Sequence, residues 1–306
     1  MRLVPMKVST LIRNNIKKFL GPRLTGYVRR GLRRPVPELN SYLSPLAGKC
    51  AIEIGGPTSM FCDGGSLPVY GVLDKVDNCV FANRTIWEER IREGRHYHYH
   101  WRKPPGQQFI CEATDLEVIQ DSSYDCVLAA NCLEHIANPL KALAEWKRVL
   151  KERGLLLLIL PHRAGTFDWR RPTTSLAHMI ADYDAGVGED DMTHLDEILS
   201  LHDRKKDKAA GSVTKFRDRC LKNQSNRAMH HHVFETRTAL AMVDHAAFQL
   251  IRVDVHKPYD IIILARRCNE FPDNGLFLGP KADCLRRSPF PSDRALLSDT
   301  ASATAG

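Results

Sequence analysis

The chain has 306 residues, of which 43% are hydrophobic and 26% are charged, and this length is compatible with one elaborated domain and flexible ends. Its longest apolar run, 155–160, lies between Gly154 and Pro161 and is far shorter than the ~20 residues that span a bilayer, so it predicts a buried strand. The nine cysteines form no CxxC pair and no secretory signal precedes them. This pattern argues against a disulfide framework and favours a cytoplasmic location.

The net charge of +8 comes from the N-terminus. Residues 1–37 hold ten lysines or arginines and no acid, so the rest of the chain carries −2. A slightly acidic body offers no continuous track for phosphates, and nucleic acid is therefore not expected as a partner. The basic leader has helical periodicity, with Val8, Leu11, Ile16 and Phe19 on one face. A helical flap on the catalytic domain, peripheral contact with an anionic membrane and a targeting signal all remain open.

Strand-like and helix-like stretches alternate from residue 49 to residue 267, which indicates a parallel sheet with crossover helices. The expected strands are 50–54, 69–73, 108–112, 124–129, 155–160, 250–255 and 260–265, and the clearest helices are 139–151 and 234–248.

Two stretches depart from this alternation. Residues 161–232 are polar and rich in His, Asp and Arg, and such an insertion after the fifth strand is typical of a substrate cap. Residues 271–306 have little periodicity and predict a disordered tail. The expected organisation is therefore a basic leader over 1–37, one domain over 38–270 and a tail.

A nucleotide-like ligand is suggested by the run AIEIGGPTSMF at residues 51–61. A short apolar strand containing Glu53 leads into Gly55 and Gly56, where the backbone can approach a ligand closely. The run is not a dinucleotide fingerprint, because no third glycine follows. An acid near the end of the next strand is expected to bind ribose hydroxyls; Asp74 and Asp77 both qualify, and Asp77 is preferred.

The stretch from residue 109 to residue 162 carries a more specific pattern. In order, it contains Glu112-Ala113, Tyr124-Asp125, Leu133-Glu134-His135, Arg148-Val149-Leu150 and Gly154. This succession resembles the methyltransferase-11 type of class I S-adenosylmethionine-dependent methyltransferase. The resemblance implies an α/β fold, a Rossmann-like seven-stranded and mostly parallel sheet with helices on both faces, and S-adenosyl-L-methionine as the cofactor.

The resemblance also implies roles for single residues. The methionine end of the cofactor would be held by Glu53, Gly55 and Gly56, the ribose by Asp77, the adenine by Glu112 and Ala113, and the region beside the sulfonium by Asn131. Each of these has a structural alternative: Glu53 as a turn cap, Glu112 as a surface acid and Asn131 as a helix cap.

The insertion offers candidates for a general base on the acceptor side. His162 follows the fifth strand, where ligands bind in open α/β sheets, and His194 and the cluster His230 to His232, represented by His231, complete the expected set. Arg170 and Arg171 are candidates for gripping an acidic acceptor. The other candidates are Asp168, His178, Asp190, Asp191, His202 and Asp203.

Metal ligands are not predicted. His194 and His202, with the nearby aspartates, have metal-binding chemistry but fit no compact signature. His96, His98 and His100 alternate with tyrosines, and an exposed edge strand is favoured over a metal site there.

Transfer of a methyl group to an oxygen of a small molecule or a glycan is the function that fits best, because histidine and aspartate are plentiful where a hydroxyl would need a base. The alternative is a catalytically silent binding module that uses the basic leader to dock on a membrane or a partner.

Overall fold

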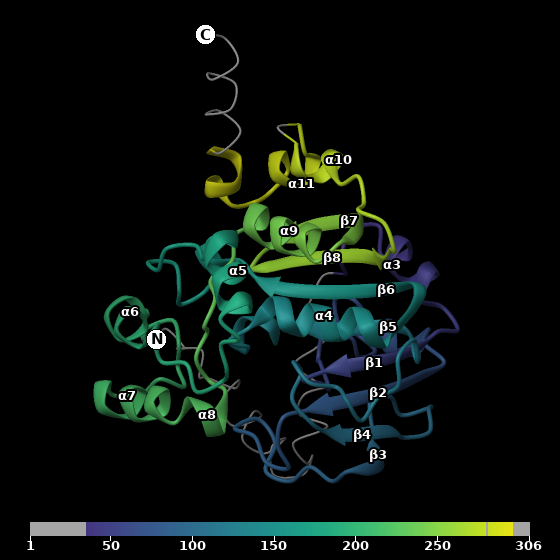
Figure 1. Cartoon of the computed structure of the whole chain (residues 1–306), viewed down its shortest axis with the longest axis horizontal. Coiled ribbons are helices and arrows are strands. Elements are labelled where there is room, and N and C mark those ends of the chain that lie inside the picture. The colour runs from purple at the N-terminus through teal and green to yellow at the C-terminus, as the bar shows by residue number, and fades with distance from the viewer. Residues whose placement is uncertain (1–34, 280, 296–306) are drawn as a thin grey trace, which may run out of the picture.

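A computed structural model describes residues 35–279 and 281–295 of the chain, and its centre is one eight-stranded sheet in the order β3-β4-β2-β1-β5-β6-β8-β7 (Figure 1). The strands are β1 Cys50–Ile54, β2 Lys75–Val80, β3 Gly94–Tyr97, β4 Gly106–Ile110, β5 Tyr124–Ala130, β6 Leu150–Pro161, β7 Phe248–His256 and β8 Asp260–Arg267.

The strands from β4 to β6 run parallel, and antiparallel pairs close both sides of this block. β6 pairs with β8 and β8 with β7 in antiparallel register, and β3 is an antiparallel edge strand on β4. The predicted α/β fold with a mostly parallel sheet is confirmed, and β3 makes eight strands instead of seven. β3 includes His96 but ends at Tyr97, so the predicted edge strand covers only the first of the three alternating histidines.

Helices and turns cover both faces of the sheet. One face is covered by α4 (Pro139–Val149), α5 (Leu176–Asp184) and α9 (Thr236–His245), and the other by α3 (Asn40–Leu46) and the 3-10 turn η1 (Val69–Gly71). α4 begins where the Asn138 side chain accepts a hydrogen bond from the Lys141 amide and Pro139 occupies the first turn. Its apolar stripe buries Trp146 completely.

The predicted strand over 69–73 is wrong. Val69, Tyr70 and Leu73 are buried, but they pack on a face of the sheet from η1, and the strand follows as Lys75–Val80. Two buried polar residues, Asp77 and Asn78, hide this strand in the sequence. Apolar periodicity therefore indicated the buried turn and missed the strand beside it.

The insertion after β6 forms short helices at the carboxyl ends of the parallel strands, toward which the arrowheads of β1, β2 and β4 point in Figure 1. Besides α5 it contains η3 (Arg163–Gly165), α6 (Leu195–Leu201), α7 (Val213–Leu221) and α8 (Asn223–Asn226). α6 and α7 share a small apolar cluster that includes Ile198, Phe216 and Cys220. A role as a substrate cap stays a prediction.

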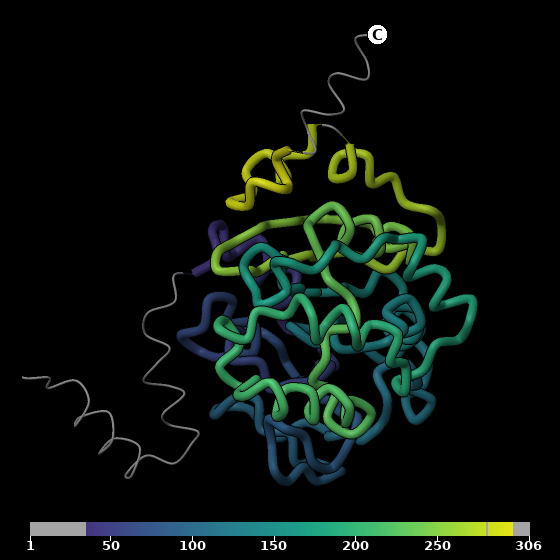
Figure 2. Tube along the Cα trace, turned by 90° about the vertical axis from the view of Figure 1, so that its left-hand side faces the viewer, coloured from purple at the N-terminus to yellow at the C-terminus, as the bar shows by residue number. Residues whose placement is uncertain are grey.

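The prediction of a disordered tail from residue 271 is wrong for the residues up to 295. This segment contains α10 (Gly275–Leu278) and α11 (Asp283–Arg286) and lies beyond β7 in Figures 1 and 2. The fully buried Asp293 anchors it, accepting hydrogen bonds from the hydroxyls of Thr236 (2.6 Å) and Ser288 (2.5 Å). Polar anchors of this kind leave no periodic signal in a sequence.

No helix within residues 35–279 and 281–295 has the length and apolar character to cross a membrane. The predictions for the leader fall almost wholly on residues 1–34, which lie outside the described residues.

Asp293→Ala should lower the free energy of unfolding by about 2 kcal/mol, because it leaves the buried Thr236 and Ser288 hydroxyls without their acceptor. Urea unfolding followed by circular dichroism measures this. The matched control is Asp283→Ala on the exposed side of α11, which should leave the midpoint unchanged. Equal midpoints for both variants would contradict the anchoring role of Asp293.

Candidate active site

A cavity of about 1840 Å³ opens at the carboxyl ends of the parallel strands, where ligands bind in open α/β sheets. The sheet side of its wall is formed by the residues that end each strand: Gly55 and Gly56 after β1, Val80 in β2, Cys111 after β4 and Asn131 after β5. The insertion forms the opposite wall. Pockets that bind one drug-sized ligand measure ~300–1,000 Å³, so this cavity has room for a cofactor and an acceptor together.

The glycine turn after β1 lies at the cavity, whereas Glu53 lies behind it. The Glu53 side chain is fully buried, and its carboxylate accepts hydrogen bonds from the hydroxyls of Tyr70 (2.6 Å) and Tyr97 and from the amide of Thr58 (3.1 Å). Burial raises the pKa of Glu53, and these hydrogen bonds act against the rise. Glu53 therefore fixes the turn that faces the cavity instead of facing a ligand itself.

Close packing behind the turn explains the two glycines. A Cβ on Gly56 would overlap the Glu53 carboxylate and the Tyr97 hydroxyl, and Gly55 has a φ of +79°. The Gly56 amide donates to Oδ1 of Asn78 in β2 (3.0 Å). The turn is thus held from behind by polar side chains, and its backbone is the surface offered to the cavity.

Asp77 does not lie where its predicted ribose-binding role requires. It is buried in the interior of β2 opposite Ile52, and its carboxylate accepts from Lys75 (2.8 Å), the Tyr124 hydroxyl (2.9 Å) and the Gln107 amide (2.6 Å). The predicted ribose-binding role assumed a strand that ends at residue 73. The strand is instead β2, so Asp77 lies inside it and not at its end. The first carboxylate after Asp77 in the chain is Glu88, and it lines the cavity.

Glu112, Ala113 and Asn131 line the cavity, as expected of cofactor-binding residues. The Glu112 carboxylate pairs with Arg227 from the insertion at 2.6 Å. Asn131 has a φ of +49°, an uncommon conformation for a residue other than glycine and one that is frequent at functional sites. Their contacts with a cofactor stay predictions.

The three histidines chosen as general-base candidates lie outside the cavity wall. His162 is fully buried, stacks on Phe290 at 3.9 Å and places Nε2 3.3 Å from Asp293. The ordered C-terminal segment covers it, which the expected disordered tail did not allow for. His231 is buried with Nε2 2.9 Å from Nδ2 of Asn223, and burial lowers its pKa to about 4.

His230, the neighbouring member of the predicted cluster, does line the cavity. Its Nδ1 lies 2.6 Å from Oδ2 of Asp168. Burial acts to raise the pKa of Asp168, but His230 and Arg171 outweigh it, and the pKa falls to about 2. An ionised carboxylate only accepts hydrogen bonds, so Nδ1 carries the proton and the lone pair of Nε2 is free.

Glu134 and His135 from the 3-10 turn η2 (Leu133–His135) lie beside His230 in the cavity wall. The His135 ring meets the His230 ring edge-on at a centroid distance of 4.6 Å, and its Nδ1 lies 2.9 Å from the Met229 carbonyl. Burial raises the pKa of Glu134 to about 7 and lowers that of His135. The three residues offer ligand atoms within 4.8 Å of one another, so this corner has donors for a cation as well.

Arg171 does not grip an acceptor. It is almost fully buried and donates to Glu197 (2.7 Å), Asp168 (3.2 Å) and the His230 carbonyl (2.8 Å). Arg170 instead stacks on the exposed Trp169, with the guanidinium carbon 4.7 Å from the ring centroid. Both arginines were predicted as candidates, but nothing in the sequence indicates that Arg171 is buried and Arg170 is exposed.

The sequence reasoning missed Tyr70 and Tyr97, because residues far apart in the chain reveal no shared hydrogen-bond partner. Glu134 and His135 appear in the sequence analysis only as part of the family pattern, without a role in the site. The LEH run after a predicted strand was the available signal that both lie at the ligand edge of the sheet.

Residues 88–158 match the model of a family described as a methyltransferase domain. This match lies within the stretch that carries the resemblance to the methyltransferase-11 type, and it confirms that resemblance for residues 88–158. No curated protein matches the chain.

Solved methyltransferase structures resemble the chain at low identity. An S-adenosylmethionine-dependent methyltransferase from Mesorhizobium loti is 14% identical, with a TM-score of 0.44 over 76% of this chain and 96% of its own. One from Aquifex aeolicus is 13% identical, with a TM-score of 0.42 over 83% and 98%. The 1,6-didemethyltoxoflavin-N1-methyltransferase of Burkholderia thailandensis, solved with S-adenosylhomocysteine, is 9% identical, with a TM-score of 0.43 over 88% and 94%.

S-adenosylmethionine is the cofactor that the family match implies, and the residues at the strand ends fit it. The turn of Gly55 and Gly56 offers its backbone to the cavity, because Glu53 and Tyr97 fill the space behind it, and Glu112 and Ala113 also line the cavity. Asp77 is internal, and Glu88 supplies a carboxylate to the cavity wall.

Gly56→Ala should weaken S-adenosylmethionine binding at least about tenfold, or 1.4 kcal/mol, because the new methyl group pushes the turn away from Glu53 and into the cavity. Isothermal titration calorimetry measures this on the full chain. Gly71→Ala is the matched control, since a Cβ there meets nothing closer than 3.5 Å. Similar affinity in both variants would place the cofactor elsewhere.

Proposed function

We propose that the chain transfers a methyl group from S-adenosylmethionine to a hydroxyl oxygen of a small-molecule or glycan-type acceptor, with His230 as the general base. The observation that carries the proposal is the buried pair of His230 and Asp168 in the cavity wall, with 2.6 Å between Nδ1 and Oδ2. A hydroxyl must lose its proton to become methylated, and an imidazole with a free Nε2 is suited to take it.

When bound, S-adenosylmethionine supplies a methyl group on a sulfonium centre that leaves as a neutral thioether. The chain then has two tasks: to position the acceptor and to remove its proton. The hydroxyl proton passes to Nε2 of His230, and the imidazolium that forms stays beside the Asp168 carboxylate. The rings of Phe167 and His135, with centroids 4.7 Å and 4.6 Å from that of His230, restrict its rotation and form an aromatic surface next to it.

Asp168 is a positioning residue whose own orientation is fixed by Arg171. The guanidinium donates to Oδ1 of Asp168, which leaves Oδ2 for His230, and it also donates to the backbone carbonyl of His230. The imidazole is therefore held at its ring and at its backbone by one buried network. A general base must be held in one orientation toward its substrate, and this network holds the His230 ring in that way.

The direct experiment is to mix the protein with S-adenosylmethionine and a panel of hydroxylated small molecules and saccharides, and to measure S-adenosylhomocysteine release. Release is expected with at least one hydroxylated acceptor and not with its O-methylated analogue. Release with the blocked analogue would contradict oxygen as the acceptor atom. Well-folded protein that binds no S-adenosylmethionine would overturn the proposal altogether.

His230→Ala should lower kcat by about 100-fold or more while cofactor affinity stays within about twofold, because the base acts only in proton removal. Steady-state kinetics and calorimetry on the same preparation test both halves. His245→Ala, on the exposed end of α9, is the matched control and should keep normal turnover. Undiminished kcat in His230→Ala would exclude His230 as the base.

The pH profile should show the charge state of His230. Burial acts to lower its pKa, but the Asp168 carboxylate outweighs burial and raises the pKa above the ordinary 6.5. The neutral base is lost as the pH falls, so kcat/KM should decline with an apparent pKa above 6.5. In Asp168→Asn this limb should shift to lower pH and the plateau should fall about tenfold or more. An unshifted limb would contradict the pairing.

A further inference from the structure

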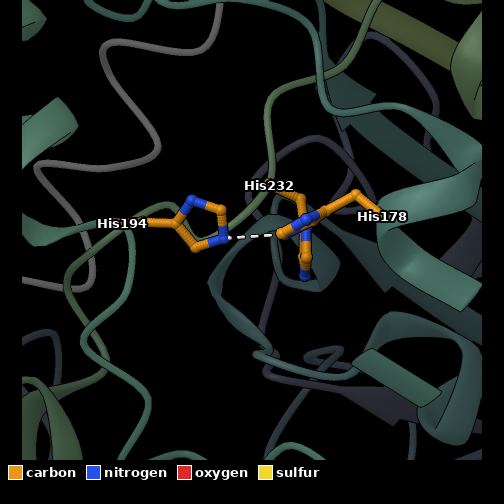
Figure 3. Close-up of side chains that lie close together, drawn as sticks. All are labelled: His178, His194 and His232. Carbon is orange, nitrogen blue, oxygen red and sulfur yellow. Dashed lines mark hydrogen bonds between the residues drawn. The ribbon is translucent and has the colours of Figure 1, made fainter. Parts of the chain in front are cut away.

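Three imidazoles from separate segments of the insertion converge at a point that does not belong to the cavity wall (Figure 3). His178 lies in α5, His194 directly precedes α6, and His232 comes from the extended segment before α9. One ring nitrogen of each lies within 4.8 Å of one ring nitrogen of both others. Convergence from three segments far apart in the sequence does not follow from helical or strand periodicity.

The distances match those between ligands of one metal ion. Nε2 of His178 lies 3.1 Å from Nε2 of His194 and 3.2 Å from Oδ2 of Asp182. Two ligands at about 2.05 Å from a tetrahedral zinc ion are separated by about 3.4 Å. Asp182 is therefore the carboxylate next to His178.

Hydrogen bonds within the protein leave this group incomplete. Nδ1 of the buried His232 and Oδ2 of Asp182 have no hydrogen-bond partner among the described residues. Nε2 of His232 lies 2.9 Å from the Ala137 carbonyl, and a carbonyl only accepts, so the proton is on Nε2 and the Nδ1 lone pair is unused. A buried lone pair without a partner is costly unless a ligand meets it.

The types of donor atom in this group suit a cation. Metal ions bind neutral imidazoles and carboxylates, and a ligating histidine commonly donates its second ring N–H to a backbone carbonyl, as His232 does to Ala137.

We infer that His178, His194 and His232 form a binding site for one divalent zinc-type ion, with the Asp182 carboxylate beside His178. Three imidazoles supply three of the four positions of a tetrahedral zinc ion. A ligating nitrogen carries no proton, so the hydrogen shared between the Nε2 atoms of His178 and His194 moves to Nδ1 of its own neutral ring when the ion binds. The ion ties α5, the start of α6 and the 230–232 segment together, and this site does not depend on the proposed methyl transfer.

The test uses the full chain, stripped with a chelator and dialysed. Zinc is titrated in competition with a chromophoric chelator, and cobalt(II) is added separately to record the visible absorption of four-coordinate cobalt. One equivalent of zinc per chain is expected, together with a four-coordinate cobalt spectrum and a higher Tm. Folded protein without stoichiometric zinc binding would overturn the inference.

Variants assign the ion to this group. His178→Ala and His194→Ala remove half-exposed rings, so the fold should persist by circular dichroism, and zinc affinity should fall at least about tenfold. His245→Ala is the surface control and should bind normally. His135→Ala tests the second group of donors, in the cavity wall. Zinc binding that survives His178→Ala and His194→Ala but is lost in His135→Ala would overturn the assignment.

Discussion

The buried guanidinium of Arg171 is the interaction on which the insertion depends. It joins the turn after β6 to α6 and to the 230–231 segment through Asp168, Glu197 and the carbonyls of His230 and His231. A buried guanidinium is costly unless its donors are satisfied, and here carboxylates and carbonyls accept from Nε and both terminal nitrogens. Movement of the 230–232 segment would therefore leave the buried Arg171 guanidinium without hydrogen-bond acceptors.

Both functional proposals draw on that constraint. Arg171 orients Asp168, the hydrogen-bond partner of the proposed base His230. Two residues after His230, the 230–232 segment supplies His232 to the histidine cluster. His230 of this segment lies in the cavity wall, whereas His232 lies with His178 of α5 in the histidine cluster. The inner wall of the cavity and the proposed metal site are therefore two sides of one fixed strand of chain.

The sheet could be predicted where apolar residues determine it. β1 was predicted with its observed bounds, and β5, β6, β7 and β8 lie within a few residues of their predicted positions, because continuous or alternating apolar runs form them. β2 was missed because Asp77 and Asn78 are satisfied inside the sheet by Tyr124, Gln107 and Gln108, partners that no local pattern reveals.

The site followed the same division. Gly55 and Gly56 line the cavity because strand ends meet the ligand edge of a parallel sheet, and Asn131, which the family resemblance named, lines it as well. His162 also follows a strand end but lies outside the cavity wall, because Phe290 and Asp293, about 130 residues away in the chain, cover it. A histidine next to a strand end is exposed to a ligand only if no later segment packs on it.

The insertion also shows why polar anchors are needed there. Its own apolar cluster has five buried members, Ile198, Ala210, Phe216, Cys220 and Met229, whereas the sheet has large clusters on both faces. A unit with so little apolar burial gains little from the hydrophobic effect, and small units of this kind usually rely on ion pairs, disulfides or metals.

No disulfide joins cysteines within the described residues, so the interactions that can hold the insertion in place are ion pairs and metal ligation. Arg171 provides one, and Arg227 provides another by bridging Glu112 on the sheet side and Glu189 in the insertion at 2.6 Å and 2.7 Å. The Glu189 carboxylate accepts a hydrogen bond from the Ala137 amide, and the Ala137 carbonyl accepts one from Nε2 of His232. A chain of polar contacts thus runs from Glu112 in the cavity wall through Arg227, Glu189 and Ala137 to His232. An ion held by His178, His194 and His232 would therefore stiffen the wall that carries Glu112 and His230.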